Sequence, residues 1–414
     1  MDKPERKYPV NISLLARIKE YLKTYPTQFW LLFWGMLVHT TGMSMVWPFL
    51  VVYIGEELAL PLSVVTSLIT INAVMRLGSS LIAGSIADRL GRKWSMVISL
   101  VISGGGLALM IPAQTYWHYA LIMVVRGAFQ PLYRVGADAM IADLVPSEQR
   151  ADAYALVRLS KNLGIAMGPA LGGILAAKSY GISFSIAAGA ALFFGLLIAL
   201  YAFETLPEKA REVQEKLIEN LKAYLDILRD RMFTSFVFGF TLRQISGSML
   251  WVLLGAYAKE NYGLPESIYG LIPTTNALMV VFLQLFVTRK TSPYNPLAVM
   301  SLGTLLYGIG VGSIALGNGF WGFWVSMIIV TIGELMVIPT ASTYTANRAP
   351  ETMRGRYMSL LALTWGAGSM VGPLLGGFLN DTFSPKAIWY GGGAAGMLGA
   401  VIFLILVLKR KGTS

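Results

Sequence analysis

The sequence predicts an all-α membrane protein of about twelve transmembrane helices, arranged in two pseudo-symmetric six-helix bundles. Three observations lead to this fold class: an apolar composition, a series of long apolar segments and an internal repeat. Of the 414 residues, 55% are hydrophobic and 13% are charged, whereas a soluble domain carries roughly 25% charged residues. The apolar side chains must therefore face lipid or neighbouring helices.

Each expected span is an apolar run of about 20 residues, the length that crosses a bilayer. The spans are 29–53, 61–83, 95–112, 118–143, 153–177, 183–203, 233–258, 267–288, 297–316, 320–346, 357–380 and 387–408. They divide the chain into a basic N-terminal segment (1–28), an N-terminal bundle (29–203), an amphipathic cytoplasmic linker (204–232), a C-terminal bundle (233–408) and a tail (409–414).

The two halves share a pattern of glycines and a proline in their fifth spans. Each residue of the first set has its counterpart 204 residues later: Gly164, Gly168, Pro169, Gly172 and Gly173 are repeated as Gly368, Gly372, Pro373, Gly376 and Gly377. Glycines four apart lie on one helix face and let another backbone approach closely. A tight packing seam is one interpretation of this pattern, and in either case the halves are built alike.

Lysines and arginines in the loops set the orientation. With the N-terminus inside, the outer loops contain only Lys178, Lys259 and Lys386, and the inner segments hold most of the 33 basic residues. This bias predicts a multi-pass protein of the cell (inner) membrane with both termini cytoplasmic. It also explains the net charge of +11, so nucleic acid is not an expected partner, and we expect a monomer in the lipid bilayer.

The residue content argues against a metal or cofactor. There is no cysteine, and the two histidines, His39 and His118, are too few for a metal cluster. No G-x-x-x-x-G-K-[ST] phosphate loop is present. We find no catalytic grouping and expect no enzyme activity, so any energy used should come from an ion gradient.

A charged corner lies between the second and third spans. Gly84, Asp88, Arg89, Gly91 and Arg92 fall in the sequence GSIADRLGRK. The carboxylate and the cations can pair in one conformation and separate in another, although an ordinary basic loop would look similar.

This loop resembles motif A of the major facilitator superfamily, and the Gly164–Gly173 stretch resembles motif C of its 12-span drug:proton antiporter branch. Arg126 resembles the motif B arginine, which the family links to proton transfer. The resemblance implies the major facilitator fold, with the first, fourth, seventh and tenth spans around a central cavity. It also implies that Asp88 and Arg92 lock the cytoplasmic side in one state.

Two carboxylates lie well inside the spans, Asp138 and Glu334. A mid-bilayer charge costs roughly 2.5–3.5 kcal/mol, and burial disfavours the anion. Glu334 lies near the middle of the tenth span and could exchange a proton, or it could be locked in a structural contact. Arg126, Gln130, Arg134 and Asp138 share one face of the fourth span, so Arg134 and Asp138 can pair.

The 204-residue offset matches His39 with Arg243 and Gln130 with Glu334. We expect all four to face the cavity, although a core role for His39 is an open alternative. The expected cavity walls also carry Met36, Met43, Trp47, Phe129, Tyr133, Trp251, Phe282, Met336 and Trp365. Aromatic and methionine faces suit large apolar guests, and cations bind over aromatic rings.

These features predict a proton-coupled exporter of amphipathic, cationic small molecules that works by alternating access, with Glu334, Asp138 and Arg126 in proton coupling. The alternative is a carrier of a polar metabolite, sugar, organic anion or lipid, and the residues that would suit it are His39, Arg243, Gln244, Asn276 and Thr331. A membrane sensor or scaffold without transport is a third hypothesis.

Overall fold

The computed structural model describes residues 24–206, 227, 229–350 and 353–411. Most of the expected N-terminal segment and linker, and the end of the tail, lie outside these residues. The part of the chain that the structure describes is helical and contains no strand. The expected all-α fold class is therefore confirmed.

Within its described residues, the N-terminal half contains eight α-helices and two short 3-10 helices. Their bounds are α2 Thr27–Val46, η1 Trp47–Phe49, α3 Leu50–Leu58, α4 Leu62–Ser80, α5 Ala83–Leu90, α6 Arg92–Met110, α7 Tyr116–Leu144, η2 Ser147–Gln149, α8 Arg150–Ala176 and α9 Tyr180–Tyr201. The first expected span is interrupted at Pro48 in η1, because proline lacks the N–H that a continuous helix would use.

The C-terminal half repeats this order. Its helices are α11 Arg231–Tyr262, α12 Glu266–Tyr269, α13 Leu271–Thr291, α14 Pro296–Ser313, α15 Gly319–Arg348, α16 Arg354–Thr382 and α17 Ala387–Lys411. Among the described residues, 10 helical segments are long and apolar enough to cross a membrane. Helices α7 and α8 have the length, 29 and 27 residues, but they contain most of the charged residues expected inside the spans.

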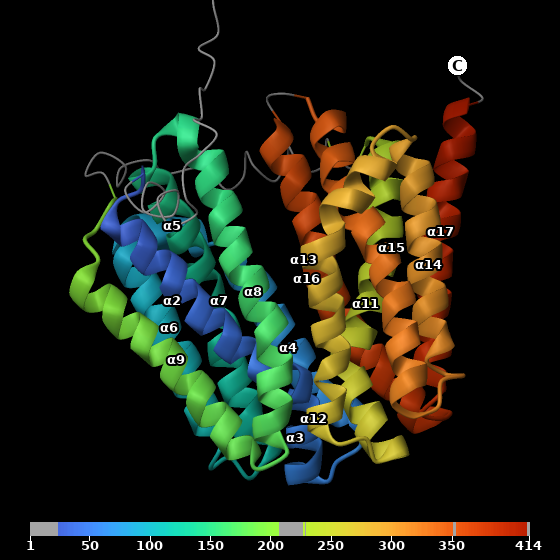
Figure 1. The fold of residues 1–414 in the computed structure, drawn as a ribbon, viewed down its shortest axis with the longest axis horizontal. Coiled ribbons are helices and arrows are strands. Elements are labelled where there is room, and N and C mark those ends of the chain that lie inside the picture. The colour runs from blue at the N-terminus through green and yellow to red at the C-terminus, as the bar shows by residue number, and fades with distance from the viewer. Residues whose placement is uncertain (1–23, 207–226, 228, 351–352, 412–414) are drawn as a thin grey trace, which may run out of the picture.

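The helices form two bundles, α2–α9 and α11–α17 (Figure 1). We call the end at which α2 begins and α17 ends the terminal end, and the opposite end the far end. The bundles converge at the far end, where α3 and α12 lie, and stand apart at the terminal end (Figure 1). Helix α4 packs against α16, and α8 packs against α12 and α13.

Polar contacts join the bundles at the far end. The backbone N–H of Ser63 on α4 donates to Asp381 of α16 over 2.8 Å. Lys259 of α11 forms ion pairs with Glu56 in one bundle and Glu266 in the other, and donates to the hydroxyl of Tyr180 over 3.0 Å. These contacts close the molecule at this end.

The described residues form three apolar cores, one shared by the two bundles and one in each bundle. One core combines both bundles, and in it the rings of Phe49 and Tyr269 lie 5.7 Å apart. The second core, around Phe29, belongs to the N-terminal bundle alone, and the third, around Phe233, to the C-terminal bundle alone. The bundles therefore share an apolar core at the far end, whereas each has its own core at the terminal end.

The repeated glycines lie at two kinds of helix contact, those within each bundle and those between the bundles. A Cβ at Gly164, Gly168 or Gly172 would meet atoms of α2, the nearest being the carbonyl oxygen of Met45 at 2.2 Å from position 172. Their counterparts Gly368, Gly372 and Gly376 meet α11 at 2.2 to 2.7 Å. These glycines therefore form the close helix seams within each bundle that their spacing predicts.

The last glycine of each set faces the other bundle. A Cβ at Gly173 would lie 2.3 Å from the carbonyl oxygen of Glu266, and one at Gly377 would lie 2.5 Å from Oγ1 of Thr66. Pro169 also contacts the C-terminal bundle, through its carbonyl oxygen at Gly270. The pattern therefore builds both the bundles and the junction between them.

Candidate transport site

Glu334 lies near the middle of α15 with a half-buried side chain. Its Oε2 accepts a hydrogen bond of 2.9 Å from Nδ2 of Asn276 on α13. The same amide donates to Oγ1 of Thr331 over 3.0 Å, so the acid and its donor belong to a small polar group between α13 and α15. No cation among the described residues forms an ion pair with Glu334.

Arg243, the repeat partner of His39, lies elsewhere than expected. Its side chain is only 2% exposed and points from α11 toward α14, where Cζ lies 4.0 Å from the centre of the Tyr307 ring. One guanidinium nitrogen donates to Oε1 of Gln244, while Nε and the other terminal nitrogen have no partner within the described part of the chain. Arg243 is therefore packed inside the C-terminal bundle and does not line an open cavity, because the aromatic face of Tyr307 holds the cation.

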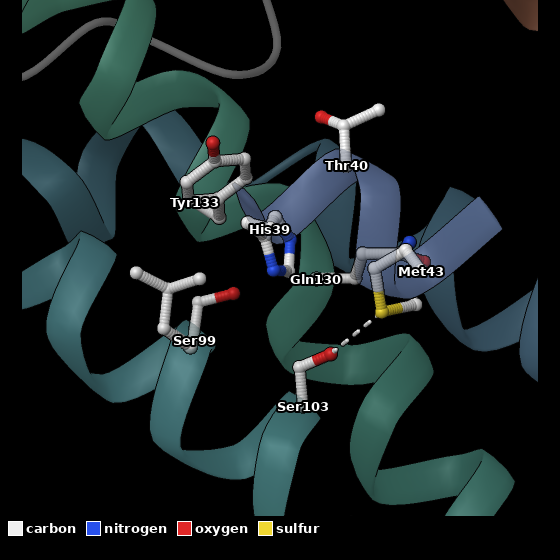
Figure 2. Close-up of a pocket in the computed structure, with 8 residues that line it drawn as sticks. His39, Thr40, Met43, Ser99, Ser103, Gln130 and Tyr133 are labelled. Carbon is white, nitrogen blue, oxygen red and sulfur yellow. Dashed lines mark hydrogen bonds between the residues drawn. The ribbon is translucent and has the colours of Figure 1, made fainter. Parts of the chain in front are cut away.

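In the N-terminal bundle, His39 and Gln130 come together with Met43 and Tyr133 (Figure 2), at a cavity inside this bundle and not at the expected central one. They line a cavity of about 210 Å³ between α2, α6 and α7. The rings of His39 and Tyr133 lie 5.1 Å apart. Helix α6 supplies Ser99, Leu100 and Ser103, and these serines were not among the expected site residues.

Arg126 lies next to this cavity. One terminal nitrogen of its guanidinium is 4.0 Å from the sulfur of Met43. Its aliphatic stem lies against Gly106, where a Cβ would be 2.6 Å from Cδ of the arginine. A side chain at position 106 would displace the arginine, so this glycine makes the room for it.

Arg134 and Asp138 pair as their spacing predicts, with Nε 3.8 Å from Oδ2. Their side chains are 78% and 44% exposed, so the pair lies on an open face of α7. The backbone carbonyl of Asp138 accepts from the hydroxyl of Tyr154 on α8 over 2.8 Å. Asp138 thus has a cationic partner, whereas Glu334 has none.

The other expected wall residues separate into two groups. Trp47, Phe129, Phe282 and Trp365 are exposed, with 40%, 36%, 75% and 49% of their surfaces accessible. Met36 is fully buried in the N-terminal core, Met336 is 9% exposed, and Trp251 packs against the core that joins the bundles. Met36 therefore belongs to the core and not to a cavity wall, because its face of α2 points into its own bundle.

The motif A residues form the corner at the terminal end. Asp88 on α5 pairs with Arg92 at the start of α6, and Nε of Arg92 lies 3.6 Å from Oδ2 of Asp143 on α7. Arg89 is exposed, and Gly84 has open space around it. Gly91 makes the turn with φ +92°, a conformation that glycine adopts without strain.

Glu204 is a member of this corner that the sequence analysis missed. It follows α9, and its carboxylate accepts from the backbone N–H groups of Arg92 at 2.8 Å and Lys93 at 3.2 Å. An acid there satisfies the free N–H groups and the positive end of α6. An acidic residue directly after the sixth span is the only signal in the sequence that pointed to it.

No group of three or more His, Cys, Asp or Glu residues able to hold a metal occurs among the described residues. Two features with polar groups inside the bundles are Glu334, which has no ion-pair partner among the described residues, and the cavity at His39 and Gln130. Two repeat-related bundles that meet at one end and carry polar groups at mid-depth are the architecture of a secondary membrane transporter.

The chain belongs to the Major Facilitator Superfamily, whose family model matches residues 32–245 and 236–414. It is 27% identical over 390 residues to a Na(+), Li(+), K(+)/H(+) antiporter of Planococcus maritimus, covering 87% of this chain and 89% of that protein. It is 24% identical over 379 residues to the quinolone resistance protein NorA of Staphylococcus aureus (strain MSSA476), covering 91% and 96%.

Among solved structures, the chain resembles a mutant of the nucleoside transporter NupG with a TM-score of 0.77 at 13% identity, covering 91% of this chain and 99% of that one. It matches the peptide transporter POT in complex with sulfate with a TM-score of 0.74 at 16% identity, covering 93% and 94%. At these identities the likeness establishes the fold. The protein is thus a multi-pass membrane transporter of the superfamily.

Proposed function

We propose that this transporter is a proton-coupled antiporter that exports amphipathic, cationic small molecules, with Glu334 as the group that exchanges a proton for substrate. The observation that carries the proposal is the state of this side chain. It is an intramembrane carboxylate, hydrogen-bonded by Asn276 at 2.9 Å and without an ion-pair partner among the described residues.

An acid in this position suits exchange for a physical reason. A bare carboxylate within the bilayer is costly, and either a proton or a bound cation removes that cost. Because both compete for one group, binding of one favours release of the other. Asp138 is a weaker candidate because Arg134 already balances its charge.

The basic residues of the loops place the terminal end in the cytoplasm under the positive-inside rule. Because the bundles meet at the far end, the described conformation then faces inward. Substrate would enter from the cytoplasm, and the bundles would rock to open the contacts of Lys259 and Asp381. In the opposite state, Asp88 and Arg92 would help to close the terminal end.

The relatives support exchange against protons. The Planococcus protein is by name an antiporter of monovalent cations and protons, and NorA is by name a quinolone resistance protein. Alkali-cation/proton antiport is therefore the second candidate, favoured by the Planococcus relative and by the oxygen atoms of Glu334 and Thr331. A carrier of polar metabolites or organic anions finds less support, because Arg243 is packed against Tyr307.

Transport in proteoliposomes with an imposed pH gradient tests the proposal. The wild type should move the cationic dye ethidium against the proton flux, whereas sodium-dependent proton release without ethidium transport would favour the second candidate. Glu334→Gln keeps the shape and stays neutral, so it should abolish gradient-driven exchange. Asp138→Asn is the matched control and should retain it. Exchange at the wild-type rate by Glu334→Gln would disprove the assigned role.

A further inference from the structure

The cavity of the N-terminal bundle is too small for a whole drug-sized molecule and large enough for an ion or one functional group. Its volume is about 210 Å³, compared with roughly 300–1,000 Å³ for drug-sized ligands and about 30 Å³ for one water molecule. Of its lining residues, Ser99 and Leu100 are buried, whereas Gln130 is exposed. A ligand group would therefore enter past Gln130.

Several polar atoms at this cavity can donate a hydrogen bond and lack a partner within the described residues. Nε of Arg126, Nδ1 of His39 and the hydroxyl of Tyr133 are fully buried and have no hydrogen-bond partner within the described residues. Ser103 reaches only the sulfur of Met43, at 4.0 Å. Buried polar groups are normally satisfied, so these three atoms are open to a ligand.

The charge at this cavity is positive and unbalanced. A guanidinium stays protonated in proteins, so Arg126 cannot itself carry the transported proton. The two acids expected inside the spans are engaged elsewhere, Asp138 by Arg134 on the same helix and Glu334 by Asn276 in the other bundle. Arg126 forms no ion pair with any described residue.

A buried cation without a partner is costly, and an anion beside it offsets that cost. Guanidinium, hydroxyl and imidazole N–H groups donate to a halide or a carboxylate, and charge-assisted bonds of this kind are the strong ones. A metal cation or an ammonium group would be repelled by Arg126. The chemistry of the cavity therefore selects a single negative charge.

We propose that the cavity binds one monovalent anionic group at Arg126, with Tyr133, His39 and Ser103 as additional donors. The group is either a free halide such as chloride or the carboxylate of a transported molecule. The second case rests on the proposed function: with a cationic end at Glu334, the substrate would be zwitterionic. Anion binding itself does not depend on proton exchange.

Thermal unfolding of the purified protein in detergent tests this site. The reference buffer contains 2-(N-morpholino)ethanesulfonate, an anion that is neither a halide nor a carboxylate, and chloride or acetate replaces it at constant ionic strength. The unfolding midpoint should rise with added anion and then saturate, as for any ligand that binds only the folded state. A rise with chloride indicates a free halide site, and a rise with acetate alone indicates a carboxylate site.

Arg126→Met should weaken this response by about 10- to 100-fold in anion concentration, the loss expected for hydrogen bonds to a charged group. In the sulfonate reference buffer the same variant should be at least as stable as the wild type, since it no longer buries an unpaired charge. Arg134→Met is the matched control: it removes an arginine that is 78% exposed on the same helix and should keep the full response.

Tyr133→Phe removes a single hydroxyl and serves if Arg126→Met does not fold; it should weaken the response several-fold. An unchanged response in these two variants, or no response of the wild type to either anion, would overturn the proposal. Glu334→Gln should keep the anion response while losing exchange. The two proposals can therefore fail separately.

Discussion

The substitution Gly173→Ala tests whether close packing at the far end favours the far-end-closed conformation. In Gly173→Ala the new methyl would lie 2.3 Å from the carbonyl oxygen of Glu266 and 3.0 Å from its carbon. Carbon atoms pack best at about 3.5–4.0 Å, so α12 and α8 must separate by about 1 Å. Overpacking of this kind costs about 1–3 kcal/mol. Because the clash exists only where the bundles meet, the cost falls on the far-end-closed state and lowers its population about 5- to 150-fold relative to the far-end-open state.

Spin labels across the far end measure this shift. The chain has no cysteine, so Lys178→Cys and Asn261→Cys, at exposed positions of the two bundles, give one unambiguous pair. Gly173→Ala should move the electron–electron distance distribution toward longer values. Gly189→Ala, where a Cβ meets no atom within 4 Å, should leave it unchanged. A wild-type distribution in Gly173→Ala would refute the role of this contact.

Two further predictions concern the terminal end. Gly91→Ala should lower the unfolding midpoint, because its Cβ would lie 2.0 Å from Oε2 of Glu204 and its φ is +92°, whereas Gly84→Ala should have little effect; equal midpoints would contradict the strain. Burial raises the pKa of Asp230, but hydrogen bonds from Arg348 and the N–H of Phe233 outweigh it and hold this pKa below its ordinary 3.8. The ionised Asp230 carboxylate should stabilise the folded state fully well above pH 3.8. This stabilisation should disappear as the pH falls through the lowered pKa that Asp230 has in the folded state. The midpoint difference between wild type and Asp230→Asn should shrink over that window, and a difference that persists below it would be inconsistent with this ionic role.

The helices were predictable from the sequence because each span must satisfy its own backbone in lipid. A run of apolar residues therefore predicts a helix even when the packing of the other helices is unknown, as in α9 and α17. Helices α7 and α8 were the harder cases, since Arg126, Asp138 and Lys161 reduce their apolar character. Both were still predicted as spans, because enough apolar residues remain over about 20 positions in each.

The site was only partly predictable. His39 and Gln130 were expected at a central cavity between the bundles, and the structure instead places both at a smaller cavity between α2, α6 and α7. Arg243 was expected at the central cavity by analogy, but repeat symmetry relates backbone positions and does not determine which ring or amide a side chain meets. No spacing or motif in the sequence marked Ser103 or Glu204 as a site residue. Their partners depend on how the helices pack.

The sequence by itself determined the fold class, the repeat and the two intramembrane acids, because these follow from composition, periodicity and the cost of charge in lipid. Only the tertiary structure decided that Glu334 has no cationic partner among the described residues, that Gly173 and Gly377 face the opposite bundle, and that Arg126 lies beside a cavity. Those outcomes depend on which helix faces are brought together. Distances between side chains on separate helices are set by packing, which no linear pattern encodes.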